Sequence, residues 1–260
     1  KDLLGRTYEY CIQQFAAYEG VKGGEFYTPA SIVKTIVSIL KPFKNCRVYD
    51  PCCGSGGMFV QSAKFIQAHS GKRGEIAVYG QESNADTWKM AKMNMAIRGI
   101  DADFGPYQAD TFFNDLHKTL KADFIMANPP FNVDKVKAES TANAGRLPFG
   151  CPKENKHKEI GNANYLWISY FYAYLNEKGR AGFVMASSAT DSQGSDKDIR
   201  EKLVRTGHVD VMINVGNNFF YTKSLPCSLW FFDKGKKEEL RNKSSFYRCK
   251  KLLYKGRSYA

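Results

Sequence analysis

Short apolar runs alternate with amphipathic stretches along most of this chain, and this alternation restricts the fold more than any other feature of the sequence. The apolar runs are expected to form strands over Cys46–Tyr49, Ile76–Gly80, Pro106–Ala109, Phe124–Ala127, Ala181–Ala186, Val209–Val215 and Leu225–Phe232. Helices are expected over Asp2–Tyr18, Ala30–Leu40, Met58–His69, Asp86–Arg98, Tyr165–Leu175 and Asp198–Arg205. Because strands joined by helices pair in parallel through right-handed crossovers, the sequence predicts an α/β fold with a doubly wound, mainly parallel sheet.

The last part of this pattern differs from the rest. No full helix separates Val209–Val215 from Leu225–Phe232, and a short connection cannot make a parallel crossover, so this pair of strands is expected to be antiparallel. Residues 131–160 show no periodicity and many polar side chains, so they are expected to form a long loop.

Charge and cysteine content limit the class of protein. The formal net charge is +12, but residues 234–260 contribute ten Lys or Arg against two Glu, so charge alone gives weak support for nucleic-acid binding. The seven cysteines form no Cys-x-x-Cys pair, which favours a reducing cytoplasm, and the dispersed histidines suggest no metal site. No apolar run has the length that a membrane span needs.

A glycine-rich turn follows the first expected strand and leads into a helix. It consists of Asp50, Pro51, Cys52, Cys53, Gly54, Ser55, Gly56 and Gly57. Glycines let the backbone turn tightly and leave room for a ligand beside the peptide groups. In a dinucleotide-binding fold that ligand is a pyrophosphate, but Asp50 at the strand end would repel a diphosphate and suits an ammonium group instead.

Two later strands are also followed by an acid. Glu82 follows Ile76–Gly80 and is placed to accept hydrogen bonds from ribose hydroxyls, while Asp110 follows Pro106–Ala109 and could accept one from an adenine amine. Each acid alone could equally be solvated or cap a helix. Together with Asp50, the three acids around one glycine-rich turn favour a nucleoside that carries a cation and no phosphates.

The tetrapeptide Asn128-Pro129-Pro130-Phe131 follows another expected strand. Prolines stiffen the backbone and donate no N–H, so the Asn128 side-chain oxygen and the Pro129 carbonyl are available as acceptors. Two acceptors on the two protons of an exocyclic amine would favour its pyramidal form, whose lone pair can attack a sulfonium methyl group. Catalysis would then rest on positioning and electrostatics. Phe131 could stack on a base taken out of a duplex, or it could be an incidental aromatic residue in a turn.

Three motifs together resemble the methylase (modification) subunit of type I restriction–modification systems, within the DNA amino-methyltransferases. Family members carry Gly-Glu-Phe-Tyr-Thr-Pro, Asp-Pro-x-Cys-Gly-Ser-Gly-Gly and Asn-Pro-Pro-Phe, which correspond here to Gly24–Pro29, Asp50–Gly57 and Asn128–Phe131 in the same order. The match extends from Leu4 to Asp233. The resemblance implies a site-specific adenine-N6 methyltransferase that transfers a methyl group from S-adenosyl-L-methionine to a flipped adenine in DNA.

The resemblance also implies roles for individual residues. The methionine end of the cofactor would be lined by Glu25, Phe26, Tyr27, Thr28 and Pro29, with Thr28 near the carboxylate. The cofactor would be held by Asp50, Pro51, Gly54, Ser55, Gly56 and Gly57, its ribose by Glu82 and its adenine by Asp110. The catalytic residues would be Asn128, Pro129, Pro130 and Phe131. One of Phe219, Phe220 and Tyr221 would pack against the extruded adenine, unless these rings belong to the core.

Domain organisation and partners follow from the same resemblance. Residues 1–29 would form an N-terminal helix and a cofactor-lining segment, 30–233 the catalytic domain, and 234–260 a basic, truncated connector. The missing initiator Met and missing flanking helical regions suggest a fragment. The implied partners are double-stranded DNA and the specificity and restriction subunits of the same system, in the cytoplasm and without a membrane. The basic loop Val133–Ile160 would close over DNA or remain solvated.

Two other kinds of function remain open. An Asn-Pro-Pro-aromatic clamp would also suit methylation of RNA adenine, cytosine N4 or a protein glutamine amide, although many such enzymes carry Tyr where Phe131 stands. A non-catalytic subunit that binds only cofactor or a partner is the other class, and the intact Asn128–Phe131 segment argues against it. A nicotinamide dehydrogenase is disfavoured by Asp50, which occupies the region of a diphosphate.

Overall fold

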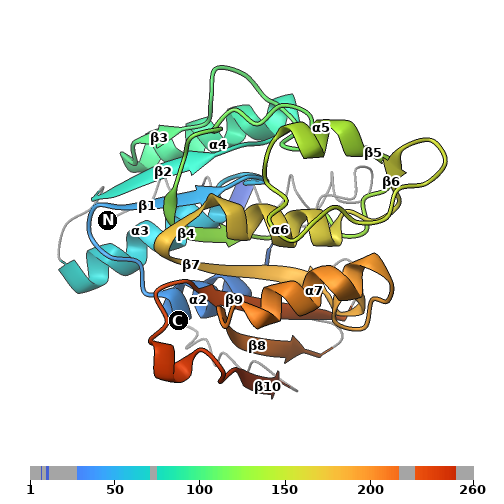
Figure 1. Cartoon of the computed structure of the whole chain (residues 1–260). Helices are drawn as coiled ribbons and strands as arrows, with labels where there is room; N and C mark the ends of the chain where they lie inside the picture. The colour runs from blue at the N-terminus through green and yellow to red at the C-terminus, as the bar shows by residue number, and fades with distance from the viewer. Residues whose placement is uncertain (1–6, 8–9, 12–27, 71–74, 217–225, 250–260) are drawn as a thin grey trace.

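One mixed sheet of eight strands organises the described part of this computed structural model, which comprises residues 7, 10–11, 28–70, 75–216 and 226–249 (Figure 1). The strands stand in the order β10-β8-β9-β7-β4-β1-β2-β3. Their bounds are β1 Cys46–Asp50, β2 Ile76–Gly80, β3 Ala102–Asp103, β4 Ala122–Ala127, β7 Leu175–Ala186, β8 Val209–Val215, β9 Cys227–Asp233 and β10 Ser245–Cys249. A separate two-stranded sheet pairs β5 (Val136–Lys137) with β6 (Glu159–Ile160).

Strand direction agrees with the pattern expected from the sequence. β1 pairs in parallel with β2 and β4, and β4 pairs in parallel with β7. β9 runs antiparallel to both of its neighbours, β7 and β8, which confirms the antiparallel pair expected near the end of the chain. β10 extends the sheet parallel to β8. This strand falls in the segment expected to be a connector, and the domain boundary at residue 233 stays a prediction.

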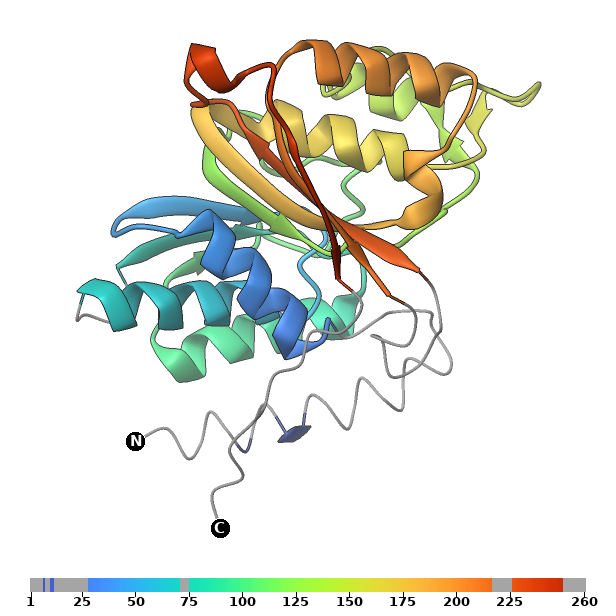
Figure 2. The same cartoon turned by 90° about the horizontal axis from the view of Figure 1, so that it is seen from below.

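Helices cover both faces of the sheet (Figure 2). The first face carries α2 (Ala30–Leu40), α3 (Gly57–Ser70) and α4 (Ala85–Arg98). The second face carries α6 (Asn164–Tyr174) and α7 (Ser195–Arg205), with the short α5 (Ala138–Asn143) nearby. Side chains alternate between the faces along each strand, so Phe124 and Met126 of β4 pack into one core, whereas Ile125 and Ala127 pack into the other.

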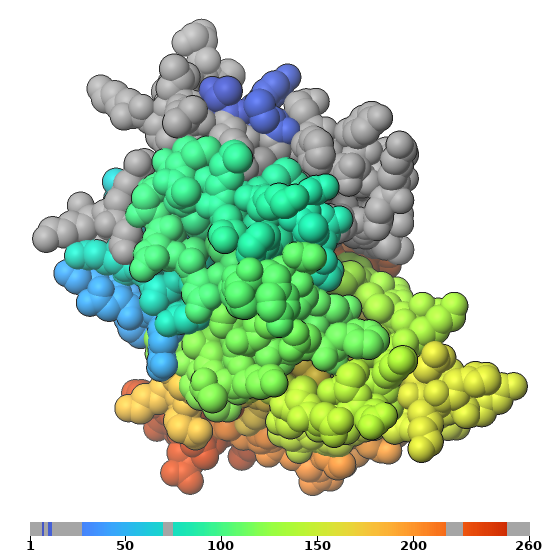
Figure 3. Space-filling model, turned by 90° about the horizontal axis from the view of Figure 1, so that it is seen from above, coloured from blue at the N-terminus to red at the C-terminus, as the bar shows by residue number. Residues whose placement is uncertain are grey.

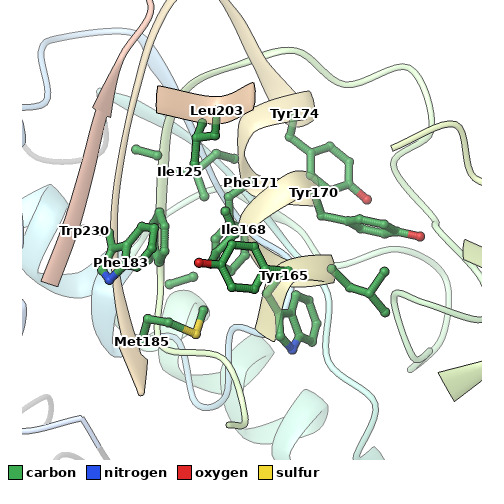
Figure 4. Packing of buried hydrophobic residues seen from close by; sticks show 14 of the residues in the cluster. Ile125, Tyr165, Ile168, Tyr170, Phe171, Tyr174, Phe183, Met185, Leu203 and Trp230 are labelled. Carbon is green, nitrogen blue, oxygen red and sulfur yellow. The ribbon is translucent and has the colours of Figure 1, made fainter. Parts of the chain in front are cut away.

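Aromatic side chains dominate the second core. Tyr165 and Phe171 of α6 lie near Phe183 of β7 and Trp230 of β9 (Figure 4). The Tyr165 hydroxyl donates to the Ala189 carbonyl at 2.6 Å, so its polar end is satisfied inside the core. α6 is buried around most of its circumference, which explains why its sequence shows no narrow apolar stripe.

The strand expected over Pro106–Ala109 is wrong. Within the described residues, β2 pairs with β1 on one side and on the other with β3, which ends at Asp103. Gly105 then adopts a φ of +70° and turns the chain, and Pro106 has no N–H with which to extend a ladder. The apolar and aromatic residues after the turn therefore predicted a strand, but the backbone at Gly105 and Pro106 does not continue the ladder of β3.

The long loop expected over residues 131–160 is also partly wrong. It contains β5, α5 and β6, and its apolar side chains Val136, Phe149 and Ile160 are buried. These elements are shorter than the windows over which periodicity becomes visible. The helix expected over Asp2–Tyr18 lies almost wholly outside the described residues. Within the described part of the chain, none of the helices combines the length and apolar character that a bilayer-spanning helix needs.

Gly182 on β7 marks a close approach between α2 and the sheet. A Cβ at this position would lie 2.9 Å from Leu40 Cδ1 and from Phe231 Cε1, and 3.0 Å from Ile36 Cγ2. Gly182→Ala is therefore expected to lower the free energy of unfolding by about 1–3 kcal/mol through overpacking, as measured by urea denaturation. Gly161→Ala is the control, because a Cβ there meets nothing within 4 Å, and it should change stability by less than about 0.5 kcal/mol. Equal effects of the two substitutions would contradict this packing.

Candidate functional site at the carboxyl ends of β2, β1 and β4

The carboxyl ends of three neighbouring parallel strands meet at one edge of the sheet. β1 lies between β2 and β4, and the last residue of β1, Asp50, is in register with Gly80, the last residue of β2. Tyr49 is in register with Ile125 of β4, two residues before that strand ends. The sheet therefore gathers the polar residues that follow these strands. In α/β sheets this edge is where ligands bind.

The glycine-rich turn after β1 has the backbone conformation that its sequence indicates. Gly54 and Gly56 have φ angles of +52° and +81°, a region that side chains other than glycine rarely adopt. A Cβ on Gly56 would lie 3.0 Å from Met95 Cε, whereas a Cβ on Gly54 or Gly57 would meet nothing within 4 Å. The turn thus packs against α4 on one side and leaves open space on the other.

Asp50 is a buried carboxylic acid at the centre of this edge, with 2% of its surface exposed. Its Oδ1 accepts hydrogen bonds from the backbone N of Cys52 at 3.0 Å and from the Cys52 thiol at 3.3 Å. Burial raises the pKa of Asp50 from 3.8 to about 7, and the Glu82 carboxylate adds to the rise, whereas the two Cys52 hydrogen bonds oppose it. A carboxylic acid with this raised pKa ionises less readily than a solvated one, and a cation bound beside it would stabilise the carboxylate.

Glu82 connects the ends of β1 and β2. Its Oε2 accepts from the backbone N of Gly54 at 3.0 Å, and its Oε1 accepts from the backbone N of Asn84 at 2.8 Å. Asn84 in turn caps α4, because its side chain accepts from the backbone N of Asp86 and of Thr87. The Glu82 carboxylate is therefore fixed against the glycine-rich turn, and its Oε1 also accepts from the Ser83 hydroxyl at 3.4 Å.

Asp110 lies on the segment beyond β3, and that segment returns to the same edge. The backbone N of Ala109 donates to the Glu82 carbonyl at 2.9 Å, so the two acids are brought close through their backbones. Asp110 itself is exposed, and its Oδ1 accepts from the backbone N of Phe112 at 2.8 Å. Among the described residues no helix begins directly after Asp110, so it caps a turn and not a helix, and its exposed carboxylate remains accessible to a ligand.

Asn128 follows β4 and presents a carboxamide with one engaged end. Its Nδ2 donates to the Thr28 hydroxyl at 2.9 Å, and its Oδ1 is buried without a hydrogen-bond partner among the described residues. A buried acceptor without a partner is costly and indicates that a donor belongs there. Pro129 is buried, Pro130 is exposed, and Phe131 is half-buried against the core under α2, α3 and α4. Thr28 thus lies beside Asn128 as well as next to Pro29, which caps α2.

Several expected site residues lie outside the described part of the chain. They are Glu25, Phe26 and Tyr27 before Thr28, and the aromatic residues Phe219, Phe220 and Tyr221. Their assigned roles stay predictions. The roles expected for the described residues also stay predictions, although the sheet does bring Asp50, Glu82 and Asn128 to one edge.

Residues that support the site were missed in the sequence. Buried Gln81 donates from Nε2 to the Ala109 carbonyl at 3.1 Å and accepts at Oε1 from the backbone N of Leu116. Asn94 donates to the Ser55 carbonyl at 2.6 Å, which ties the glycine-rich turn to α4. No sequence pattern marks a buried amide on a helix. The position of Gln81 directly before Glu82 is the one signal that could have identified it.

The hydrogen-bond acceptors and the open space at this edge of the sheet fit a nucleoside that carries a positive charge. Adjacent strand ends carry two buried acids, open space beside two glycines, and a buried carboxamide oxygen that has no partner in the part of the chain that the structure describes. Within the described residues there is no group of three or more His, Cys, Asp or Glu that could hold a metal ion. Burial raises the pKa of the Cys52 and Cys53 thiols well above their usual value, so neither is a reactive thiolate here.

Comparisons with known proteins agree with this chemistry. A model of the N-6 DNA Methylase family matches residues 1–258. The methylase subunit of the type I restriction enzyme HindI from Haemophilus influenzae is 42% identical over 240 residues, which cover 92% of this chain and 53% of that protein. The methyltransferase subunit of a type I restriction–modification system from Streptococcus thermophilus has a solved structure with a TM-score of 0.78 and 26% identity, covering 91% of this chain and 50% of that one.

The fold has a wider distribution than the family. A Listeria monocytogenes protein assigned to the class I S-adenosylmethionine-dependent methyltransferases aligns with a TM-score of 0.71 at 15% identity, covering 94% of this chain and 72% of that one. The doubly wound, mainly parallel sheet expected from the sequence is thus the fold of that class. The chain spans about half the length of the curated relatives it matches.

The raised pKa of Asp50 has a measurable effect on stability. Between its ordinary value of 3.8 and about 7, the folded chain holds the proton that the unfolded chain has released, so stability falls as the pH rises through this window. Asn at this position cannot ionise. Asp50→Asn is therefore expected to raise the melting temperature at pH 8 by at least about 3 °C and to change it by less than about 1 °C at pH 4.

The measurement is thermal unfolding followed by circular dichroism, without cofactor. Asp86→Asn, at an exposed acid in the first turn of α4, is the control and should give no gain at pH 8. A gain for Asp50→Asn that is equal at both pH values would show that the burial of Asp50 does not shift its titration.

Proposed function

The chain belongs to the N-6 DNA methylase family, and from this membership we propose that it is the catalytic core of a type I restriction–modification methylase subunit. Its reaction would transfer a methyl group from S-adenosyl-L-methionine to the N6 amine of an adenine in DNA. One observation carries the proposal: the Oδ1 of Asn128 is buried at the end of β4, beside the strand that ends in Asp50, and no described residue donates a hydrogen bond to it. An acceptor for an amine proton thus lies next to an acid suited to a cation.

The cofactor is assigned to the ends of β1 and β2. The open space beside Gly54 and Gly57 leaves room for it, Asp50 can bind its ammonium group, and Glu82 can accept from its ribose hydroxyls. Asp110 would accept from its adenine amine. When bound, S-adenosyl-L-methionine supplies an electrophilic methyl group on a sulfonium centre.

Asn128 would act on the substrate amine. Its Oδ1 and the Pro129 carbonyl would accept the two amine protons and stabilise the pyramidal form in which the nitrogen lone pair is available. Thr28 supports this role, because its hydroxyl accepts from Asn128 Nδ2 and so keeps Oδ1 turned away from it. The described site holds its groups in place before the substrate arrives, so its main contribution would be positioning rather than general-base catalysis.

DNA and two further subunits are the proposed partners. The relatives are methylase subunits of type I restriction enzymes, so a specificity subunit and a restriction subunit of the same system are expected to assemble with the full-length protein. The flipped base would stack on Phe131 and on one of Phe219, Phe220 and Tyr221. Family membership favours adenine in DNA over cytosine N4, RNA adenine or a glutamine amide, all of which present a similar planar amine.

Cofactor binding and methyl transfer are expected to respond differently to two substitutions. Asp50→Asn removes the charge that binds the ammonium group and should weaken S-adenosyl-L-methionine binding at least about tenfold, as measured by calorimetry on the chain. Asn128→Ala removes the amine acceptor and should leave this affinity within about threefold, while slowing single-turnover methyl transfer by the assembled enzyme about 100-fold or more.

Asp86→Asn serves as the matched acid control and should change neither quantity. Loss of cofactor binding in Asn128→Ala, or full methyl transfer by it, would contradict the assigned roles.

A projecting basic turn supports the DNA assignment. Residues 151–160 follow the tetrapeptide and β5, and they form part of a lobe at one end of the molecule (Figure 3). Lys153, Lys156 and Lys158 are exposed there, and Asn155 fixes the turn by accepting from the backbone N of His157 and of Glu159. Three positive charges on a fixed, exposed turn suit contacts to phosphates.

Reversing these three charges tests that contact. The triple substitution of Lys153, Lys156 and Lys158 by Glu in the assembled enzyme is expected to weaken DNA binding and to lower the slope of log K against log salt by up to about 3. The same change at Lys41, Lys178 and Lys237, which are exposed elsewhere, is the control. A slope equal to that of the wild type would remove the turn from the DNA interface.

A further inference from the structure

Asn132 directly follows the tetrapeptide, and its side chain accepts hydrogen bonds from the side chains of two other asparagines, Asn162 and Asn164. The backbone N of Asn132 donates to Asn164 Oδ1 at 2.9 Å, and Asn164 Nδ2 donates back to Asn132 Oδ1 at 2.9 Å. Asn162 Nδ2 donates to the same Asn132 oxygen at 3.0 Å, and Asn162 Oδ1 accepts from the backbone N of Asn164 at 2.9 Å. We call Asn132, Asn162 and Asn164 the amide clamp.

The backbone N–H of Asn132 determines which way the carboxamides of the clamp are turned. Because a peptide N–H can only donate, the Asn164 atom that faces the backbone N of Asn132 must be the oxygen. The Asn164 nitrogen is then the atom that faces Asn132 Oδ1, so that atom must be an acceptor. One backbone donor thus determines the arrangement of both carboxamides.

The clamp holds a backbone conformation that would otherwise be costly. Asn132 has a φ of +55°, in the left-handed region, where asparagine is among the few residues other than glycine that are tolerated. This residue turns the chain immediately after Phe131. The backbone N of Ala163 donates to the Val133 carbonyl at 2.8 Å and adds a further tie on the same side.

The other half of the clamp stands on a rigid element. Asn164 is 3% exposed and is the first residue of α6, whose next seven residues are buried in the aromatic core. Thr28 holds Asn128 at the opposite end of the tetrapeptide. The segment Asn128–Phe131 is therefore fixed at both ends by side-chain hydrogen bonds.

We infer that the amide clamp is a positioning device for catalysis, which fixes the backbone after Phe131 so that the Phe131 ring and the Asn128 and Pro129 acceptors are held for the substrate base. This inference rests on the proposed function, since it assigns the clamp to the same site. The clamp residues act through the tetrapeptide and need not touch the substrate. Because a displacement of about 1 Å in a reacting group can cost about 100-fold in rate, loss of the clamp should slow methyl transfer rather than weaken cofactor binding.

The test compares two substitutions that both tolerate the left-handed backbone. Asn132→Asp keeps the oxygen that accepts from Asn162 and Asn164, whereas Asn132→Gly removes it. In the assembled full-length enzyme, Asn132→Gly is expected to lower the single-turnover rate of methyl transfer to an adenine-containing duplex about tenfold or more. Asn132→Asp is expected to stay within about threefold of the wild type. The Kd for S-adenosyl-L-methionine should change less than twofold in both variants.

Two further variants, one inside the clamp and one outside it, test the positioning role. Asn164→Asp retains the acceptor for the backbone N of Asn132 but turns an oxygen toward Asn132 Oδ1, so it should slow transfer as Asn132→Gly does. Asn143→Ala removes an exposed asparagine of α5 outside the clamp and should match the wild type. If the wild type transfers methyl groups and Asn132→Gly does so at the same rate, the clamp has no positioning role. If the wild-type assembly transfers none, the proposed function fails and the inference fails with it.

Discussion

The parallel pairing of β1 with both β2 and β4 is the constraint on which the rest of the site depends. It places Asp50, Glu82 and Asn128 at one edge of the sheet, although these residues are up to 78 positions apart in the sequence. Because a shift of register by one residue would turn the strand side chains to the other face and displace the residues that follow each strand, the two cores that alternate along β4 also fix the site. The geometry of the edge follows from the packing of the whole sheet.

The site carries costs that the rest of the fold must offset. Burial makes ionisation of Asp50 unfavourable, the turn after β1 requires two glycines in left-handed conformations, and Asn128 Oδ1 is buried without a partner among the described residues. Each feature is unfavourable in isolation and useful toward a ligand that supplies a cation and an amine donor. The extensive aromatic core beneath α6 supplies rigidity on the same side as the amide clamp.

Much of the fold could be predicted from the sequence because long elements repeat their apolar residues at clear periods. The helix at Ala30–Leu40 and the strands at Ile76–Gly80 and Val209–Val215 have the bounds that were expected. The strand expected at Pro106–Ala109 was not found, because composition cannot show that Gly105 has already turned the chain. The glycine-rich turn and the tetrapeptide were visible as motifs. Gln81, Asn94 and the amide clamp were not, since their roles arise from contacts between distant segments.

In the proposed reaction, the acceptors at the end of β4 receive an adenine N6 amine beside a methyl donor held at β1 and β2. The most direct measurement is the identity of the methylated product. The assembled enzyme would be incubated with S-adenosyl-L-methionine carrying a labelled methyl group and with duplex DNA, and the DNA would be digested to nucleosides and separated by chromatography. The label is expected in N6-methyladenine. Label in N4-methylcytosine, or in protein or RNA added in parallel and not in DNA, would contradict the proposed reaction.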